Sequence, residues 1–158
     1  MKNLEYLNGL NNEQKEAVTY LDGPVLIVAG AGSGKTKVLT SKIAHILNSK
    51  KAYPNQILSV TFTNKAANEM TGRIEQILDQ PIPEMWCGTF HSISNRLLRR
   101  HYKEAGLEKD FSILDSDDQL RVIKRHLKEL DIDEDQWPPE KVRWQINNWK
   151  DEALRPKD

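Results

Sequence analysis

The chain has 158 residues, of which 38% are hydrophobic and 29% are charged, and its formal net charge is zero. This composition is typical of a soluble globular protein of one domain, or of one domain plus part of another, and no apolar stretch approaches the length of a membrane span. Zero net charge excludes a globally basic nucleic-acid binder, so any such binding must come from a local patch. The single cysteine, Cys87, and an N-terminus without a secretory pattern fit a cytoplasmic protein.

The first expected element is a helix from Leu10 to Leu21. Asn11 or Asn12 is suited to cap its start, and Gly23-Pro24 to end it. Gln14 lies in this helix. Its amide both donates and accepts, so it can read an adenine edge, although a glutamine in this position alone is more commonly a solvated surface residue.

A glycine-rich loop follows Val25–Val28, an apolar run that predicts a buried strand. Small residues let successive backbone N–H groups surround phosphate oxygens, and the next helix, Thr36–Leu47, offers its positive end to the same anion. The loop pattern usually has glycine where this chain has Ala29. The sequence predicts nucleotide binding, with a lysine for the terminal phosphates and a threonine for Mg²⁺, over Ala29, Gly30, Ala31, Gly32, Ser33, Gly34, Lys35 and Thr36.

A second strand is predicted over 57–62, followed by a helix from Lys65 to about Leu78 that Asn64 is suited to cap. The segment 61–67 therefore lies at the carboxyl end of a strand, where open α/β sheets bind ligands. Its aromatic, hydroxyl and amide side chains suit a phosphodiester backbone and a stacked base. The alternative is an ordinary strand end with a helix cap.

The same combination of residues recurs at 88–92, after a third predicted strand at 85–89 and before a helix from Ile93 to about Tyr102. Two such strand ends indicate one surface for a single strand beside the nucleotide. A basic run follows on the helix, which alone is more commonly a solvated face; it comprises Arg96, Arg99, Arg100, His101 and Lys103. Cys87 with His91 is too small a set to predict a metal site.

Strands alternating with helices predict an α/β fold with a doubly wound parallel sheet up to residue 112, and a mostly helical part over 113–158. The helical part is expected to contain a helix over 116–130, with a capping box of Ser116 and Gln119, and a last helix from Pro138-Pro139 to Lys150. Asp115 follows a short apolar run, as a magnesium-binding carboxylate does, but its place before a helix favours a simple cap. The pair Asp151-Glu152 lacks a preceding strand and is rejected as catalytic.

Taken together in order and spacing, these segments resemble the superfamily 1 helicases of the UvrD/Rep/PcrA type. The resemblance covers nearly the whole chain and rests on Leu10-Asn11-x-x-Gln14, 29–36, 61–67 with Met70 and Arg73, 88–92, 113–115 and 150–156. It implies a RecA-like P-loop NTPase sheet, here the partial first motor domain over 1–112, interrupted by a helical insertion whose start is 113–158. It further implies ATP-driven 3′ to 5′ translocation on single-stranded DNA, in DNA repair or replication, with proteins of those processes as partners.

The resemblance also assigns residues. Gln14 becomes an adenine reader, and Lys37 stands where relatives carry an arginine beside the base, so the base is expected to be held less firmly. Catalysis is assigned to Lys35 and Thr36, with Mg²⁺ on Thr36. Contacts to single-stranded DNA are assigned to Thr61, Phe62, Thr63, Asn64, Thr89, His91 and Ser92.

Relatives of this type are several times longer, so the chain is expected to be an N-terminal ATP-binding fragment. Alone it is expected neither to hydrolyse ATP nor to unwind DNA, because the water-activating carboxylate and the phosphate-sensing arginines cannot be found in it. The open alternatives are a RecB/AddA-type helicase–nuclease motor fragment, a non-catalytic nucleotide-sensing module and, least favoured, a small kinase. Missing strands would also leave an open sheet edge prone to self-association.

Overall fold

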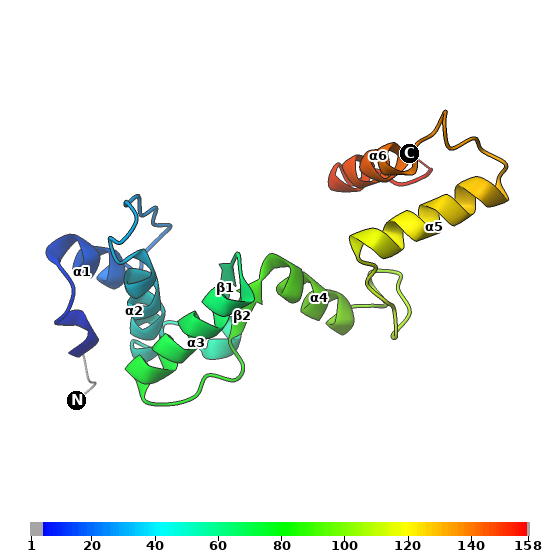
Figure 1. Cartoon of the computed structure of the whole chain (residues 1–158). Coiled ribbons are helices and arrows are strands. Elements are labelled where there is room, and N and C mark those ends of the chain that lie inside the picture. Colours follow the sequence, from blue (N-terminus) through cyan, green and yellow to red (C-terminus); the bar gives the residue numbers. More distant parts are fainter. Residues whose placement is uncertain (1–4, 158) are drawn as a thin grey trace. The chain divides into compact units, whose positions relative to one another are not determined.

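A computed structural model describes residues 5–157, which divide after Gly106 into two compact units. The first four residues and Asp158, at the ends of the expected domains, lie outside the described residues, and the boundary at residue 112 stays a prediction. Figure 1 shows the elements along the chain. The first unit contains η1 (Glu5–Leu7), α1 (Asn12–Thr19), α2 (Lys35–Asn48), η2 (Pro54–Gln56), β1 (Leu58–Thr61), α3 (Asn64–Leu78), β2 (Trp86–Thr89) and α4 (Phe90–Arg100). The second contains α5 (Ser116–Glu129) and α6 (Pro139–Asp151).

The sheet of the described residues consists of β1 and β2, which are parallel and connected through α3. Their register pairs Leu58 with Trp86 at the amino ends and Thr61 with Thr89 at the carboxyl ends. Because side chains alternate along a strand, each strand serves both faces. On one face the Cys87 thiol lies 3.6 Å from the Ala67 carbonyl oxygen of α3. The expected parallel α/β arrangement is therefore present in this small sheet.

Helix α4 packs closely against the other face of the sheet, at Gly88. A Cβ atom at this position would lie 2.6 Å from Ser92 Oγ and 3.3 Å from Ile93 Cγ1. Only glycine allows the first turn of α4 to approach the strand so closely. The close approach fixes where the helix starts relative to the strand end.

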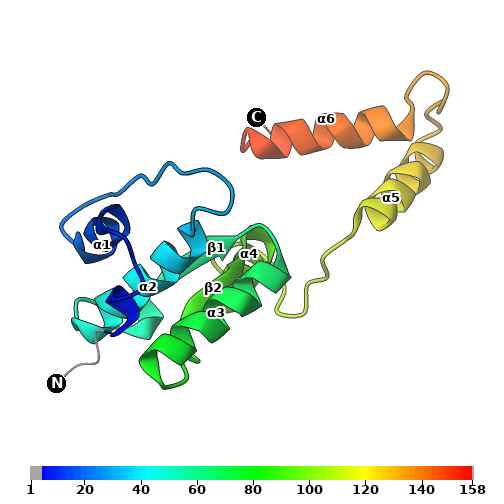
Figure 2. The same cartoon turned by 60° about the vertical axis from the view of Figure 1, so that its left-hand side comes forward.

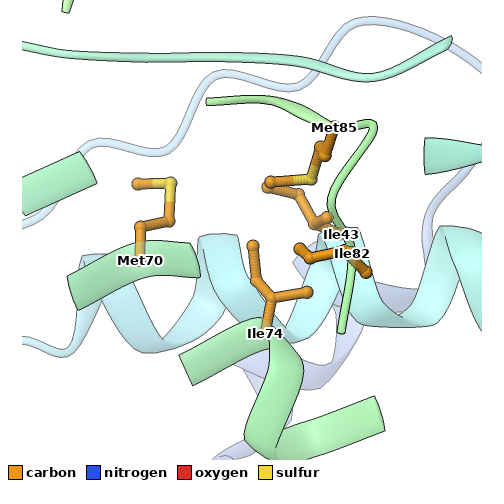
Figure 3. Close-up of a cluster of buried hydrophobic side chains, with 5 residues drawn as sticks. All are labelled: Ile43, Met70, Ile74, Ile82 and Met85. Carbon is orange, nitrogen blue, oxygen red and sulfur yellow. The ribbon is translucent and has the colours of Figure 1, made fainter. Parts of the chain in front are cut away.

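An apolar core joins α2, the helix that follows the glycine-rich loop, to α3 and to the segment before β2. Figure 3 shows its five buried side chains, which come from α2, α3 and the segment before β2; they are Ile43, Met70, Ile74, Ile82 and Met85. Burying each such side chain contributes about 1.5–3 kcal/mol. The core therefore holds α2, and with it the end of the glycine-rich loop, at a fixed position against α3.

A second, smaller cluster of Leu10, Val18 and Val38 joins α1 to α2. Polar contacts add to it, because Lys42 Nζ of α2 donates to the carbonyl oxygens of Ala17 at 2.8 Å and Tyr20 at 2.5 Å. These carbonyls belong to the last turn of α1, which has no intrahelical partners for them. Helix α1 is therefore fixed to α2 by both apolar packing and a lysine.

The prediction of a buried strand at Val25–Val28 is wrong for this structure. The segment has no regular secondary structure, and Leu26 and Val28 are 88% and 86% exposed. In Figure 2 it forms part of the long loop between α1 and α2. A parallel strand is held by backbone hydrogen bonds to neighbouring strands, and among the described residues only β1 and β2 pair with each other.

The helix starts confirm some predictions and correct others. Asn11 caps α1 in a capping box with Gln14, as one of the two predicted candidates. Thr63, not Asn64, caps α3, because its hydroxyl accepts from the Ala66 N–H at 3.1 Å. Helix α4 begins at Phe90, three residues before the predicted start, since the Thr89 hydroxyl accepts from the Ser92 N–H.

The start of α5 decides between two interpretations of Asp115. Its carboxylate oxygen Oδ1 accepts from the backbone N–H groups of Asp117 at 2.9 Å and Asp118 at 2.8 Å. The predicted capping box of Ser116 and Gln119 is therefore wrong, and Gln119 instead donates to Asn147 Oδ1 of α6 at 2.9 Å. The residues directly before Asp115, 111–114, form no strand, which supports the interpretation of this residue as a helix cap.

Helices α5 and α6 of the second unit pack as a pair. Besides the contact to Asn147, Arg143 of α6 donates to the Ser116 carbonyl oxygen at 3.2 Å. Three of the four tryptophans lie beside or on α6, and Trp137, Trp144 and Trp149 are all exposed. Within residues 5–157, no helix has both the length and the apolar character that crossing a bilayer requires.

Candidate nucleotide and nucleic-acid site

The glycine-rich loop leads directly into α2, whose first residue is Lys35. Gly32 and Gly34 have φ angles of 74° and 82°, a left-handed conformation that favours glycine. Gly34 is the N-cap and supplies no side-chain acceptor, so the first N–H groups of α2 are not capped by a side chain at this position. This is the arrangement in which a helix start attracts an anion.

The Lys35 side chain folds back over the loop. Its Nζ donates to the carbonyl oxygens of Ala29 at 2.7 Å and Gly30 at 2.5 Å. The Ser33 hydroxyl also donates to the Gly30 carbonyl oxygen, at 2.7 Å. The loop is thus a closed turn with a positive charge at its opening, and Thr36 is exposed on the first turn of α2.

The loop residues fit a phosphate group. An added Cβ at Gly30 or Gly32 would meet nothing within 4 Å, so these glycines border open space. Lys35 is exposed and free to exchange carbonyl oxygens for phosphate oxygens, which are stronger acceptors because they are charged. Thr36 offers a hydroxyl, an ordinary oxygen ligand of Mg²⁺ when phosphates supply further ligands.

Gln14 lies against this loop, as the adenine-reader hypothesis requires. Its Nε2 donates to the Ser33 carbonyl oxygen at 3.0 Å, and its Oε1 accepts from the Asn11 N–H at 3.0 Å. Both ends of the amide are therefore engaged with backbone groups. Reading an adenine edge would require the amide to leave at least one of them.

Lys37 is also held by the segment before α1. Its Nζ donates to the Gly9 carbonyl oxygen at 2.6 Å. Together with Lys42 and Gln14, this contact connects the region around α1 to α2 and to the loop before it at three points. Burial lowers the pKa of Lys42 below its ordinary value of 10.5.

The two predicted strand ends lie side by side, because Thr61 pairs with Thr89 in the sheet register. Three hydroxyls serve local structure: Thr63 and Thr89 cap α3 and α4, and the Ser92 hydroxyl donates to the Thr89 carbonyl oxygen at 3.0 Å. Thr61 likewise donates to the Thr63 carbonyl oxygen at 3.0 Å. Phosphate contacts at this edge would therefore rely on N–H groups and on the exposed residues.

The largest exposed side chains at this edge are two aromatic rings that contact each other. Phe62 is 94% and Phe90 is 62% exposed, and their ring centroids lie 6.4 Å apart at an interplanar angle of 61°. Asn64 and His91 are also exposed, on the first turns of α3 and α4. Phe90 lies in the predicted segment 88–92 but was not among the residues assigned to DNA contacts. Its place directly after β2, matching that of Phe62 directly after β1, was the signal for it.

The basic run on α4 does not lie at this edge. The Arg96 guanidinium stacks over the Trp86 ring at 4.1 Å, and Trp86 begins β2 while Phe90 follows its end. Helix α4 thus runs back along the sheet, away from the two phenylalanines. The two predicted strand ends are therefore neighbours in the sheet, whereas Arg96 lies beside the amino end of β2.

Comparison with known proteins shows the family to which the chain belongs. The model of the UvrD/REP helicase N-terminal domain family matches residues 10–158, and the chain belongs to this family. The chain is 51% identical to DNA helicase II of Escherichia coli over 150 residues, which cover 95% of the chain and 21% of that protein. It is 47% identical to the ATP-dependent DNA helicase PcrA of Bacillus subtilis over 154 residues, covering 98% of the chain and 21% of that protein. The chain therefore spans about a fifth of the length of these relatives.

Proposed function

We propose that this chain is the ATP-binding part of an ATP-dependent DNA helicase. The observation that carries the proposal is the loop of left-handed Gly32 and Gly34 at the uncapped start of α2, with the Lys35 ammonium across its opening. Membership of the UvrD/REP family and the names of the two relatives support it. The remainder of the motor would lie in the larger part of the relatives' length that the chain does not match.

The proposed fold is the RecA-like P-loop fold of a first motor domain. The parallel pair β1–β2 with helices on both faces supports this fold. The helical unit after Gly106 corresponds to the start of an insertion.

The nucleotide site comprises Gln14, the loop residues 29–36 and Lys37, all on or beside the first turn of α2. Bound Mg-ATP would supply the phosphoryl group, which passes to water with ADP as the leaving group. Lys35 then moves from the carbonyls of Ala29 and Gly30 to the terminal phosphates and stabilises their charge. Thr36 would hold Mg²⁺ through its hydroxyl, and Gln14 would turn from Ser33 to the adenine.

The DNA site comprises the carboxyl edge of β1–β2. Phe62 stacks on a base, while the N-termini of α3 and α4 face the phosphates; the remaining proposed contacts are Thr61, Thr63, Asn64, Thr89, His91 and Ser92. In the longer protein, ATP-driven closure of two domains moves this edge along single-stranded DNA in the 3′ to 5′ direction. We place that activity in DNA repair or replication, in the cytoplasm.

The proposal is tested by titrating the chain with a fluorescent ATP analogue and Mg²⁺, and separately with labelled single-stranded DNA. We expect saturable nucleotide binding that Lys35→Ala weakens at least tenfold, with unfolding unchanged because Lys35 is exposed. DNA binding should weaken with added salt. Absence of nucleotide binding by the folded chain would contradict the proposal, whereas nucleotide binding without DNA binding would favour a nucleotide sensor. The chain alone should show no appreciable ATP turnover.

A further inference from the structure

We propose that Phe90 is a second base-contacting residue, and that Phe62 and Phe90 together form a two-ring step on which neighbouring bases of single-stranded DNA stack. The inference rests on the proposed function, since it assigns a further residue to the proposed DNA site. It goes beyond the sequence assignment, which gave contacts with single-stranded DNA to Phe62 and His91 and none to Phe90.

The sheet register places the two rings side by side. Phe62 directly follows Thr61 and Phe90 directly follows Thr89, and these two threonines are paired across β1 and β2. Each phenylalanine therefore leaves the same sheet edge at the same level. The result is the observed edge-to-face pair, with centroids 6.4 Å apart and planes inclined by 61°.

Packing within the first unit does not explain this pair. The buried core cluster is built from other residues, and Phe62 and Phe90 are 94% and 62% exposed. An aromatic ring in water loses the free energy that its burial would give. Two exposed rings that contact each other offer a ready apolar surface to a flat, unpaired base, and every base has a face that can stack.

The charge around the pair favours a nucleic-acid strand over a protein surface of mixed charge. Neither 57–68 nor 85–103, the segments that carry the two rings, contains an aspartate or glutamate. The exposed side chains nearest in sequence are neutral or basic: Thr63, Asn64, Lys65, His91 and Ser92. The starts of α3 and α4 add partial positive charge at the same edge.

Inclined rings fit two successive bases better than one. A base lying flat on Phe62 would be inclined by 61° to the Phe90 ring, so the same base could not stack flat on both rings. A strand that bends at this edge can place the next base on Phe90. The pair then acts as a step that separates neighbouring bases of the strand, and its two rings share the stacking contact that Phe62 alone was expected to make.

The test compares affinities of the chain for a labelled oligodeoxythymidylate by fluorescence anisotropy. The variants are Phe62→Ala, Phe90→Ala, the double variant and Tyr53→Ala, a control in which another exposed aromatic, before the amino end of β1, is removed. We expect each phenylalanine variant to weaken binding about tenfold, the double variant to weaken it further, and Tyr53→Ala to leave it unchanged. The salt dependence should not change, because no charge is removed.

A direct map of the contacts comes from the unaltered chain, which covers the case that Phe90→Ala disturbs the start of α4. An oligonucleotide carrying 5-iododeoxyuridine is photocrosslinked to the chain, and the adducts are located by mass spectrometry. Adducts at both Phe62 and Phe90 are expected. An adduct at Phe62 without one at Phe90, or a double variant no weaker than Phe62→Ala, would overturn the inference and leave the proposed function intact. No DNA binding by a chain that binds nucleotide would overturn both the inference and the DNA site.

Discussion

Gln14 and Ser33 are 19 residues apart in sequence, yet the Gln14 side-chain Nε2 donates to the Ser33 carbonyl oxygen at 3.0 Å. The other end of the same amide accepts from the Asn11 N–H in the capping box of α1. One side chain therefore connects the start of α1 to the glycine-rich loop. Substitution of this residue should therefore affect both nucleotide binding at the loop and the stability of α1.

The two roles of Gln14 can be separated by substitution. Gln14→Glu keeps an oxygen for the Asn11 N–H but removes the donor to Ser33 and places a negative charge beside the loop, so we expect nucleotide binding to weaken about tenfold. Gln14→Ala removes the capping contact as well and should lower the free energy of unfolding by about 1 kcal/mol. Nucleotide titration and urea unfolding measure the two effects.

The neighbouring exposed residue Asn12 is the matched control, since its side chain is in the same helix turn. Asn12→Ala should leave nucleotide affinity unchanged. If Gln14→Glu bound nucleotide as tightly as the unaltered chain, the contact to Ser33 would have no role in the loop.

Substituting alanine at two glycines should have opposite effects. Gly34 has a φ of 82°, and a Cβ there would lie 3.1 Å from Gln14 Nε2, so Gly34→Ala should destabilise the chain by about 1–2 kcal/mol and weaken nucleotide binding. Gly72 lies within α3 with nothing within 4 Å of an added Cβ, so Gly72→Ala should stabilise it by about 0.5–1 kcal/mol. Thermal unfolding of both variants checks the signs, and equal shifts would contradict the left-handed loop.

Lys42 predicts a pH dependence of stability. Burial lowers its pKa below 10.5 in the folded chain, so the unfolded chain binds the proton more strongly. The free energy of unfolding should therefore rise with pH between the lowered pKa and 10.5, and Lys42 should contribute no pH dependence below that window, where both states are protonated. Comparison with Lys42→Met between about pH 8 and about pH 11 isolates this contribution from other lysines and tyrosines.

The same substitution tests the attachment of α1. Lys42→Met removes the donor to Ala17 and Tyr20 and should cost about 1–3 kcal/mol at neutral pH. The difference between the two proteins should grow with rising pH, and only within the alkaline window. A constant difference throughout would show that the pKa of Lys42 is the same in both states.

Asp115 is expected to act as a helix cap and not as a magnesium ligand. Asp115→Ala should lower the free energy of unfolding by about 0.5–2 kcal/mol, because two N–H groups of α5 lose their acceptor. Asp115→Asn retains an acceptor and should be nearly neutral. Neither variant should alter the affinity for the Mg-nucleotide, and a selective loss of that affinity in Asp115→Asn would revive the carboxylate interpretation.

The features that were predicted well depend on residues close in sequence. The start of α2 after Gly34 and the capping of α1 by Asn11 follow from local backbone chemistry. Thr63 and Asn64 are both good caps, so the choice between them was settled by geometry. The contact between Phe62 and Phe90 depends on strand register, and the exposure of Leu26 depends on which strands pair. Neither property can be predicted from a short segment of sequence.

The loop that contains Val25–Val28 has a practical consequence for anyone who purifies the chain. From Gly23 to Gly34 the chain carries no charged residue, so nothing repels a second copy from aligning along these exposed aliphatic side chains. We expect the sample to turn cloudy as it is concentrated, at a rate that rises steeply with protein content. A single acidic replacement at Leu26, which is 88% exposed, should keep the solution clear without disturbing any buried side chain.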